Sequence, residues 1–339
     1  MRAVFIHAPF DVRPGDLPAP NAGPGLVLVD VEAVGLCGSD LHYFKEGGIG
    51  AAQTITAPFV PGHEVAGRVR EAVPERGIAA GARVVIEPAR PCGACEWCHR
   101  AEANLCPHTV MLGAPPNHGG LTATVAVAPS QLFAVPEGFS AVTTALLEPL
   151  GVCIHALDLG RPQWFETVAV LGSGPIGLGI LQLLKVAGVA EPLVVEPIAY
   201  RRDAALRLGA ASVFASVEAL SAATGGRGAD LVFEATNSPD GFADATEAAA
   251  IGGRLVVVGI PDGNSYRFEA ATPRRKQLQV VFSRRMGDVL PRAIDLVARG
   301  RVDLEAWVSH RIGLAEVPDA FARLAAYEDG ALKVVVEPR

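Results

Sequence analysis

The chain has 339 residues, of which 50% are hydrophobic and 19% are charged, which excludes an intrinsically disordered protein. The formal net charge of -7 argues against binding to the phosphate backbone of nucleic acids. The length predicts two domains, because single hydrophobic cores stop growing at about 250–300 residues. The first residues, Met1 to Pro9, lack the cationic start and the long apolar run of a secretory signal, so we expect a cytoplasmic protein.

The part of the chain up to about Leu150 is predicted to be rich in β-structure. Leu26–Val34 alternates apolar and polar residues and ends at Gly35, as a half-buried strand does. Val84–Ile86 and Thr124–Val127 are further short apolar runs, and prolines and glycines separate these segments.

Four of the six cysteines form a tight cluster with the spacing C-x-x-C-x-x-C-x7-C, at Cys92, Cys95, Cys98 and Cys106. In a large chain without a signal peptide, such a cluster indicates metal binding more than disulfides. Four thiolates suit tetrahedral zinc in a closed, structural site. The alternative is a set of reduced thiols or two disulfides.

The middle of the chain alternates buried strands with helices, which predicts an α/β doubly wound parallel sheet. The apolar segment Val168–Leu184 contains five glycine or proline breaks, so we interpret it as a strand, a turn and a helix and expect no membrane span. Strands are predicted over 167–171, 193–195, 230–234 and 255–258. One helix is predicted from the glycine turn to Ala187, and two more over 201–208 and 242–250. A helix over 289–299 and a strand over 333–336 follow.

The first of these strands leads into a glycine-rich turn that is typical of dinucleotide binding. The turn reads G-S-G-P-I-G at 172–177, and an acidic residue, Glu196, follows nineteen positions after Gly177. A carboxylate there accepts hydrogen bonds from the adenosine ribose and repels a 2′-phosphate, which favours NAD over NADP. Glu196 could also be an ordinary loop carboxylate, and Arg201 and Arg202 close behind could accommodate that phosphate. The predicted cofactor contacts are Gly172, Gly174, Ile176, Gly177, Glu196 and Arg201.

Three short segments carry residues of the kind that bind catalytic zinc. They are C-G-S-D-L-H-Y at 37–43, G-H-E at 62–64 and L-E-P at 147–149. Cysteine, histidine and glutamate are zinc ligands, and three of them plus water describe a catalytic site. Singly, Cys37 could be a buried thiol, His63 a hydrogen-bonded loop histidine, and Glu64 or Glu148 a surface carboxylate. Spacing alone does not bring these residues together.

The order and spacing of these motifs resemble the zinc-containing medium-chain alcohol dehydrogenase family over essentially the whole chain. The segment 37–50 is similar to sorbitol dehydrogenases and L-idonate 5-dehydrogenases. The resemblance implies a GroES-like, β-rich catalytic domain at 1–150 and a Rossmann nucleotide-binding domain at 151–282. It also implies that residues 283–339 return to the catalytic domain.

The resemblance further implies that Cys37, His63 and Glu64 bind a catalytic zinc, in addition to the structural zinc of the cysteine cluster. Glu148 is then either another protein ligand or a hydrogen-bond partner of the zinc water. Ser39 and His42 would carry the proton of the alcohol to solvent. By analogy, the protein is a homotetramer or a homodimer.

These features together predict the NAD-linked oxidation of a secondary hydroxyl on a small polyol or sugar acid. Tyr43 is predicted either to line the substrate pocket or to be a core aromatic. Arg284 or Arg285 is predicted either to pair with a substrate carboxylate or to be a solvated surface residue. The nearest alternatives are a threonine 3-dehydrogenase-like enzyme and a general secondary-alcohol dehydrogenase. An alternative of another class is a zinc-stabilised nucleotide-binding protein without catalytic activity.

Overall fold

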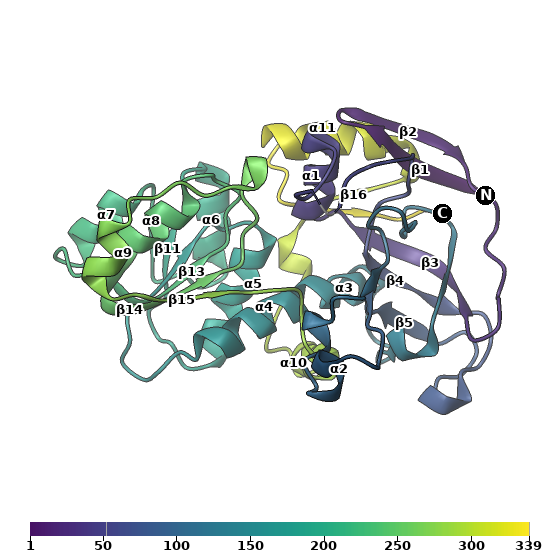
Figure 1. Cartoon of the computed structure of the whole chain (residues 1–339). Helices are drawn as coiled ribbons and strands as arrows, with labels where there is room; N and C mark the ends of the chain where they lie inside the picture. Colours follow the sequence, from purple (N-terminus) through teal and green to yellow (C-terminus); the bar gives the residue numbers. More distant parts are fainter. Residues whose placement is uncertain (52, 339) are drawn as a thin grey trace. The chain divides into compact units, whose positions relative to one another are not determined.

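The computed structural model describes residues 1–51 and 53–338, and the chain divides into two compact units (Figure 1). Unit 1 comprises Met1–Glu148, Leu290–Arg299 and Val308–Arg339, and unit 2 comprises Pro149–Val289 and Gly300–Trp307. The C-terminal segment thus returns to unit 1 in two pieces, and residues 283–289 and 300–307 belong to unit 2 rather than to the returning segment.

A seven-stranded sheet forms the centre of unit 1, with the strand order β16-β17-β3-β4-β5-β9 and with β8 also paired to β3. In β3 (Val27–Gly35), buried residues alternate with partly buried ones before the strand becomes fully buried at its end. The other strands of this sheet are β4 (Glu64–Val69), β5 (Arg83–Ile86), β8 (Thr124–Val127), β9 (Leu132–Ala134), β16 (Val308–Ile312) and β17 (Lys333–Val336). Two small antiparallel pairs accompany it, β1 (Arg2–Ala8) with β2 (Asp11–Asp16) and β6 (Ala89–Arg90) with β7 (Val110–Met111).

Short helices accompany this sheet, and two of them were not predicted from the sequence. Helix α1 (Gly38–Glu46) begins directly after Cys37, and α11 (Val317–Ala326) packs against α1. The remaining helices in unit 1 are α2 (Glu96–His99), α3 (Ala141–Ala145) and α10 (Leu290–Ala298). α10 lies within the helix predicted over 289–299.

Unit 2 contains a six-stranded parallel sheet with the order β12-β11-β10-β13-β14-β15 and with helices packed against it (Figure 1). The order reverses between β10 and β13, as in a doubly wound Rossmann fold. The strands are β10 (Val168–Leu171), β11 (Leu193–Val195), β12 (Ser212–Phe214), β13 (Ala229–Glu234), β14 (Ala249–Val257) and β15 (Gln279–Phe282). The helices are α5 (Pro175–Val186), α6 (Ala199–Arg207), α7 (Val217–Ala223), α8 (Gly241–Ala248) and α9 (Ala271–Lys276).

One predicted boundary in unit 2 is wrong. We expected a helix up to Ala250 and a strand only from Leu255, but α8 ends at Ala248 and β14 begins at Ala249. Ala249 adopts an extended conformation (φ -76°, ψ 144°), and the pairing of β13 with β14 shifts register there. An alanine-rich sequence favours a helix locally, and the strand pairing overrides that preference.

Among the described residues, one helical stretch is long and apolar enough to cross a membrane. It covers Ala141–Gly160, which is α3 followed by α4 (Leu147–Gly160), and 67% of its most apolar window is buried within the protein. A buried core helix passes the same test of length and composition. Val168–Leu184 instead forms β10 and part of α5, as predicted.

Candidate functional site

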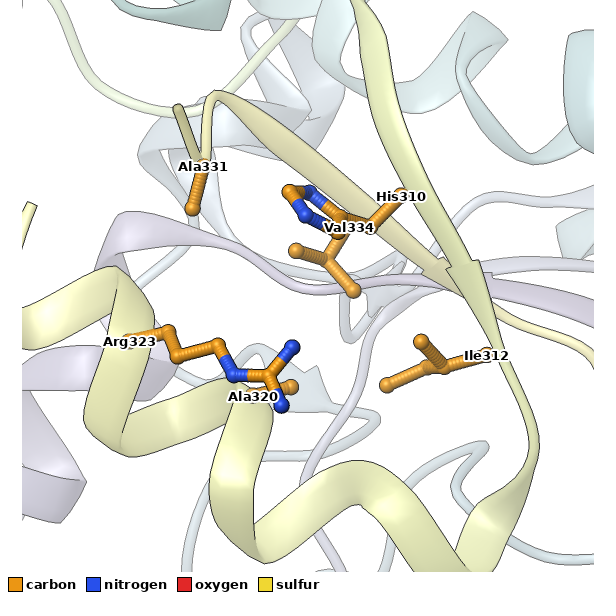
Figure 2. Close-up of a pocket in the computed structure, with 6 residues that line it drawn as sticks. All are labelled: His310, Ile312, Ala320, Arg323, Ala331 and Val334. Carbon is orange, nitrogen blue, oxygen red and sulfur yellow. The ribbon is translucent and has the colours of Figure 1, made fainter. Parts of the chain in front are cut away.

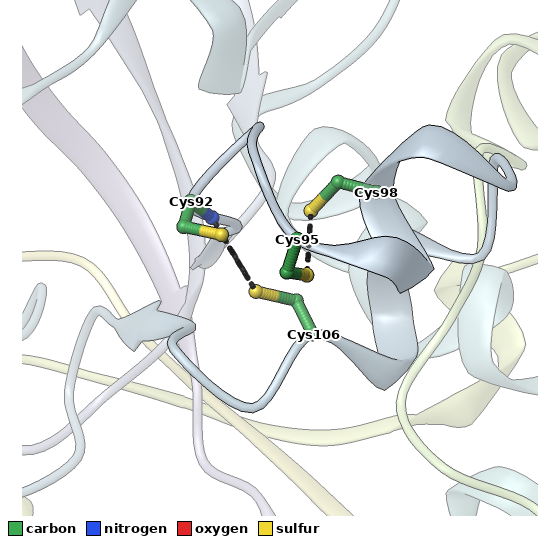
Figure 3. A group of neighbouring side chains, drawn as sticks. All are labelled: Cys92, Cys95, Cys98 and Cys106. Carbon is green, nitrogen blue, oxygen red and sulfur yellow. Dashed lines mark hydrogen bonds between the residues drawn. The ribbon is translucent and has the colours of Figure 1, made fainter.

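The four clustered cysteines converge in a small lobe of unit 1 (Figure 3). Their sulfur atoms all lie within 4.8 Å of one another, with 3.5 Å between Cys95 and Cys98 and 3.6 Å between Cys92 and Cys106. These separations are too long for disulfide bonds of about 2.05 Å. Backbone amides, first that of Cys92, lower the pKa of the Cys106 thiol to about 6. The lobe therefore presents four thiols in the arrangement that tetrahedral zinc requires.

A second cluster joins Cys37, His63 and Glu64, which spacing alone could not assemble. One ligand atom from each lies within 4.8 Å of the other two. The antiparallel pairing of β3 with β4 explains their proximity, because Gly35 is directly opposite Glu64. Cys37 follows β3 by two residues and His63 precedes β4 by one, so all three side chains lie at the same end of the two strands.

Asp40 holds two of these residues in place. It is fully buried, and its carboxylate accepts hydrogen bonds from the backbone amides of Cys37 at 3.0 Å and Gly62 at 3.3 Å. Its Oδ1 lies 3.6 Å from Nδ1 of His63, which leaves Nε2 as the nitrogen for a metal. Burial opposes the charged imidazole, but Asp40 and Cys37 raise the pKa of His63 well above its usual range. A carboxylate on the far nitrogen is the usual orienting partner of a metal-binding histidine.

Like Asp40, Lys333 was not predicted from the sequence to belong to the site. Its ammonium group is 2% exposed and donates to Oε1 of Glu64 at 2.6 Å and to the carbonyl oxygen of Leu36 at 2.9 Å. The second oxygen of Glu64, Oε2, is buried without a hydrogen-bond partner among the described residues. It lies where a side chain at position 35 would be, because a Cβ added to Gly35 would come within 1.8 Å of it.

The donor set of this cluster fits a zinc ion. A thiol, an imidazole nitrogen and an unpartnered carboxylate oxygen are three ligands of the types that catalytic zinc uses. Glu148 is buried nearby but is not part of the group of three. Burial raises the pKa of Glu148 to about 7, with His63 opposing and Glu64 reinforcing the shift.

The two residues predicted to carry the proton both lie on α1. Oγ of Ser39 lies 3.5 Å from Nε2 of His63. His42 is 5% exposed, and its Nδ1 lies 3.3 Å from a carboxylate oxygen of Glu46 one turn later in α1. Ser39 is therefore next to the cluster, and His42 is a buried histidine with an acidic partner.

The glycine-rich turn of unit 2 has the backbone geometry that a dinucleotide-binding loop needs. Gly172 adopts φ +87°, which favours glycine. A Cβ added to Gly177 would lie 1.9 Å from the carbonyl oxygen of Gly172, so only glycine permits this close packing. Gly174 caps the N-terminus of α5, where free amide groups and the helix dipole favour a phosphate. Ile176 lies in the first turn of α5.

Glu196 and Arg201 both face this loop. The Glu196 carboxylate is 3% exposed and accepts hydrogen bonds from the backbone amides of Ser173 and Ile198, each at 2.9 Å. A carboxylate accepts about four hydrogen bonds, so these bonds leave capacity for ribose hydroxyls. The guanidinium of Arg201 lies 3.9 Å from the position of a Cβ at Gly174, within reach of a phosphate bound at the loop.

The structure places Tyr43, one of the predicted substrate contacts, in the core of unit 1. Tyr43 is 2% exposed, and its ring packs edge-on against Phe59 at a centroid distance of 5.2 Å within the core of unit 1. Its position favours the alternative role of a core aromatic. Arg284 and Arg285 follow β15 in unit 2, and their role toward a substrate stays a prediction.

A separate cavity lies in unit 1 (Figure 2), and its small volume excludes a substrate. Its interior volume is about 10 Å³, roughly that of one water molecule. His310 and Ile312 come from β16, and Ala320 and Arg323 come from α11 (Figure 2). None of the residues that line it belongs to either cysteine-containing cluster.

Comparison with known proteins identifies the class of protein. Residues 23–137 match the model of the alcohol dehydrogenase GroES-like domain, and residues 175–299 match that of the zinc-binding dehydrogenase. The sorbitol dehydrogenase of Bacillus subtilis (strain 168) is 31% identical over 100% of this chain and 97% of its own length.

Solved structures agree with this class. L-idonate 5-dehydrogenase from Escherichia coli K-12 has a TM-score of 0.87 and 27% identity, and covers 99% of this chain and 97% of its own. An alcohol dehydrogenase from Escherichia coli CFT073, complexed with NADH, has a TM-score of 0.88 and 25% identity over 99% of both chains.

The chain belongs to the zinc-containing medium-chain alcohol dehydrogenase family, in its polyol dehydrogenase group. It is an oxidoreductase that uses zinc and NAD. The predicted family, fold class and enzyme class are confirmed, and the non-catalytic alternative is removed.

Proposed function

We propose that Cys37, His63 and Glu64 hold the catalytic zinc of a dehydrogenase that oxidises a secondary hydroxyl of a polyol or sugar acid. The observation that supports this most is the meeting of their three ligand atoms within 4.8 Å, with one buried Glu64 oxygen left unpartnered. The four-cysteine lobe holds a second, structural zinc. Glu148, with its raised pKa, provides either a further ligand or a hydrogen-bond partner for a water at the site.

Zinc supplies Lewis acidity toward an alcohol oxygen. The protein contributes proton transfer and orientation. Ser39 lies beside His63 and would give up its own hydroxyl proton as it accepts that of the alcohol. With the nicotinamide ribose between them, His42, which is paired with Glu46, would receive the released proton and exchange it with solvent. Asp40 fixes the ring of His63, and Lys333 fixes the carboxylate of Glu64.

The cofactor contacts that we propose are Gly172, Gly174, Ile176, Gly177, Glu196 and Arg201. The loop receives the pyrophosphate on backbone amides at the start of α5. Glu196 accepts the ribose hydroxyls and disfavours a 2′-phosphate, so NAD should be preferred to NADP. The backbone carbonyls of Glu196 and Pro197 accept hydrogen bonds from Arg202, which engages this arginine with the backbone after β11.

The experiment is NADH formation by the purified enzyme across hexitols, pentitols, idonate, gluconate, galactonate, threonine and simple secondary alcohols, repeated with NADP. We expect the highest kcat/KM on a hexitol or on idonate with NAD. A preference for threonine or for a simple alcohol would replace the polyol assignment with one of the two alternatives. Zinc analysis should give about two ions per chain, and His63→Ala should remove one of them together with activity.

We also propose that the protein is a cytoplasmic homodimer or homotetramer. Strand β15 is at the edge of the parallel sheet, and it exposes Val280 and Phe282, with 60% of Phe282 accessible. An exposed apolar edge strand is a surface that a partner usually covers. Light scattering of the wild type and of Phe282→Ser tests this, because a monomeric wild type would refute it.

A further inference from the structure

Glu234 is a buried acid at the nucleotide end of the parallel sheet, and the proposed chemistry does not use it. It is the last residue of β13 and is 1% exposed. β13 neighbours β10 at the point where the strand order reverses. Dinucleotides bind at the carboxyl ends of strands at such a point, so Glu234 is at the edge where the cofactor is expected.

One carboxylate oxygen of Glu234 organises the turn that follows β13. Oε1 accepts a hydrogen bond from the backbone amide of Thr236 at 2.8 Å and another from the Thr236 hydroxyl. The same hydroxyl accepts the backbone amide of Ser238 at 3.2 Å. The conformation of this turn therefore depends on a single buried oxygen.

This turn packs directly against the glycine-rich loop. A Cβ added to Gly172 would lie 2.7 Å from the carbonyl oxygen of Ala235 and 3.0 Å from Cγ2 of Thr236. The amide of Gly172 is in turn bonded to the carbonyl of Val195 in β11 at 2.8 Å. Because Gly172 has no side chain to absorb a displacement, a shift of Thr236 would move the backbone of the loop itself.

Glu234 also ties the end of β14 to the same turn. Its carbonyl oxygen accepts the backbone amides of Val258 at 2.8 Å and Gly259 at 3.1 Å. A Cβ added to Gly259 would lie 1.9 Å from the carbonyl oxygen of Thr236, so the two loops are in close contact. One residue thus connects three of the backbone segments that border the nucleotide edge.

We propose that Glu234 is a positioning residue for NAD, which holds Thr236 against Gly172 and thereby sets the backbone amides that receive the pyrophosphate. It acts through the loop and not on the reacting atoms. This inference rests on the proposed nucleotide site.

For holding the turn in place, we expect the shape of the Glu234 side chain to matter more than its charge. Oε2 is buried and has no hydrogen-bond partner in the described part of the chain. Burial raises the pKa of Glu234, and the charge of Asp244 acts in the same direction. Tyr266 faces the acid, but its hydroxyl donates to the carbonyl of Gly259. A neutral glutamine, with the same oxygen available to Thr236, should therefore replace Glu234.

The experiment measures the dissociation constant of NADH by fluorescence, together with KM for NAD and for the polyol, on zinc-loaded enzyme. Glu234→Ala should weaken NADH binding about tenfold, the effect of one to two lost hydrogen bonds. Glu234→Gln should stay within about threefold of the wild type on the same scale. The matched control is Glu247→Gln on α8, whose carboxylate is 60% exposed and bonds to Thr272, and it should bind NADH as the wild type does.

A second variant covers the case in which Glu234→Ala does not fold. Thr236→Val removes the hydroxyl but keeps a methyl group against Gly172, so it should weaken NADH binding about threefold. This loss should disappear in the Glu234→Ala background, because the two residues act as a unit.

Several outcomes would overturn the inference. They are wild-type NADH binding by Glu234→Ala or by Thr236→Val, an equal loss in Glu234→Gln and Glu234→Ala, and a parallel loss of zinc and of polyol affinity. A wild-type enzyme that binds no NADH would instead refute the nucleotide site itself.

Discussion

Removing the buried ammonium group of Lys333 should destabilise the protein more than any surface charge change. Lys333 and Glu64 are 2% and 0% exposed, and their charged atoms are 2.6 Å apart. Lys333→Met leaves the Glu64 carboxylate buried without its partner, which costs about 3–5 kcal/mol. For a unit of this size, that loss lowers Tm by roughly 6–20 °C.

The assay is thermal unfolding followed by circular dichroism, with and without added zinc. The loss in Lys333→Met should be smaller with zinc, because a cation at the cluster compensates part of the buried Glu64 charge that the variant leaves unpaired. The double variant Lys333→Met/Glu64→Gln should recover part of the stability, since it removes both charges. Lys185→Met is the matched control, because Lys185 is exposed and makes one long contact of 3.5 Å to Gly209.

Two results would refute this reasoning. One is a Lys333→Met variant as stable as Lys185→Met, which would mean that the pair contributes no net stabilisation. The other is a double variant that is less stable than Lys333→Met by as much as Glu64→Gln alone destabilises the wild type. The two positions would then contribute to stability independently.

Three further predictions concern other parts of the molecule. Gly35→Ala should lose zinc and activity, because its Cβ would lie 1.8 Å from the buried Oε2 of Glu64. Gly38→Ala is the control, since its Cβ would have nothing within 4 Å, and it should retain both in a metal analysis and a rate assay. Cys95→Ser should lower the zinc content from about two ions per chain to about one, and a chelator should then unfold the lobe more readily, as measured by proteolysis. Arg254 donates two 2.8 Å bonds to Glu166 and lowers the pKa of that acid. Arg254→Gln should cost about 1 kcal/mol at pH 7. In denaturant titrations this difference should shrink as the pH falls through the folded-state pKa of Glu166, which leaves the part due to the bonds of Arg254 to the carbonyl oxygens of Gly160 and Arg161.

The parallel sheet of unit 2 was predictable because its strands are continuous apolar runs between turn residues. Leu193–Val195 forms β11 at the predicted bounds, and the strand expected over 167–171 begins one residue later as β10. The same approach missed α1 and α11. The sequence of α1, G-S-D-L-H-Y-F-K-E, is short and largely polar, so its buried face is visible only against α11 and the core of unit 1.

The two metal clusters differ in how much the sequence could predict. The cysteine lobe is local, because fifteen residues of chain contain all four thiols, and their spacing alone indicates a closed site. Cys37 and His63 are brought together by strand pairing, and no periodicity within either segment reveals that register. Only the family resemblance grouped them, and it left out Asp40, although that carboxylate is part of the quoted motif.

The sequence around Lys333 carries a signal for a buried acidic partner. Lys333 begins a strand that continues with Val334, Val335 and Val336, all of which are buried. A lysine is almost never buried in such a strand unless it is paired with an acid. A partner acid is then expected on another strand of the same sheet, and β17 pairs with β3, which pairs with β4. Glu64 is the first residue of β4, 269 positions earlier in the chain, so the pairing follows from the sheet order and not from either segment. A buried lysine in an apolar strand is therefore a signal for an acidic site elsewhere, and the sheet topology is the information that the sequence lacks.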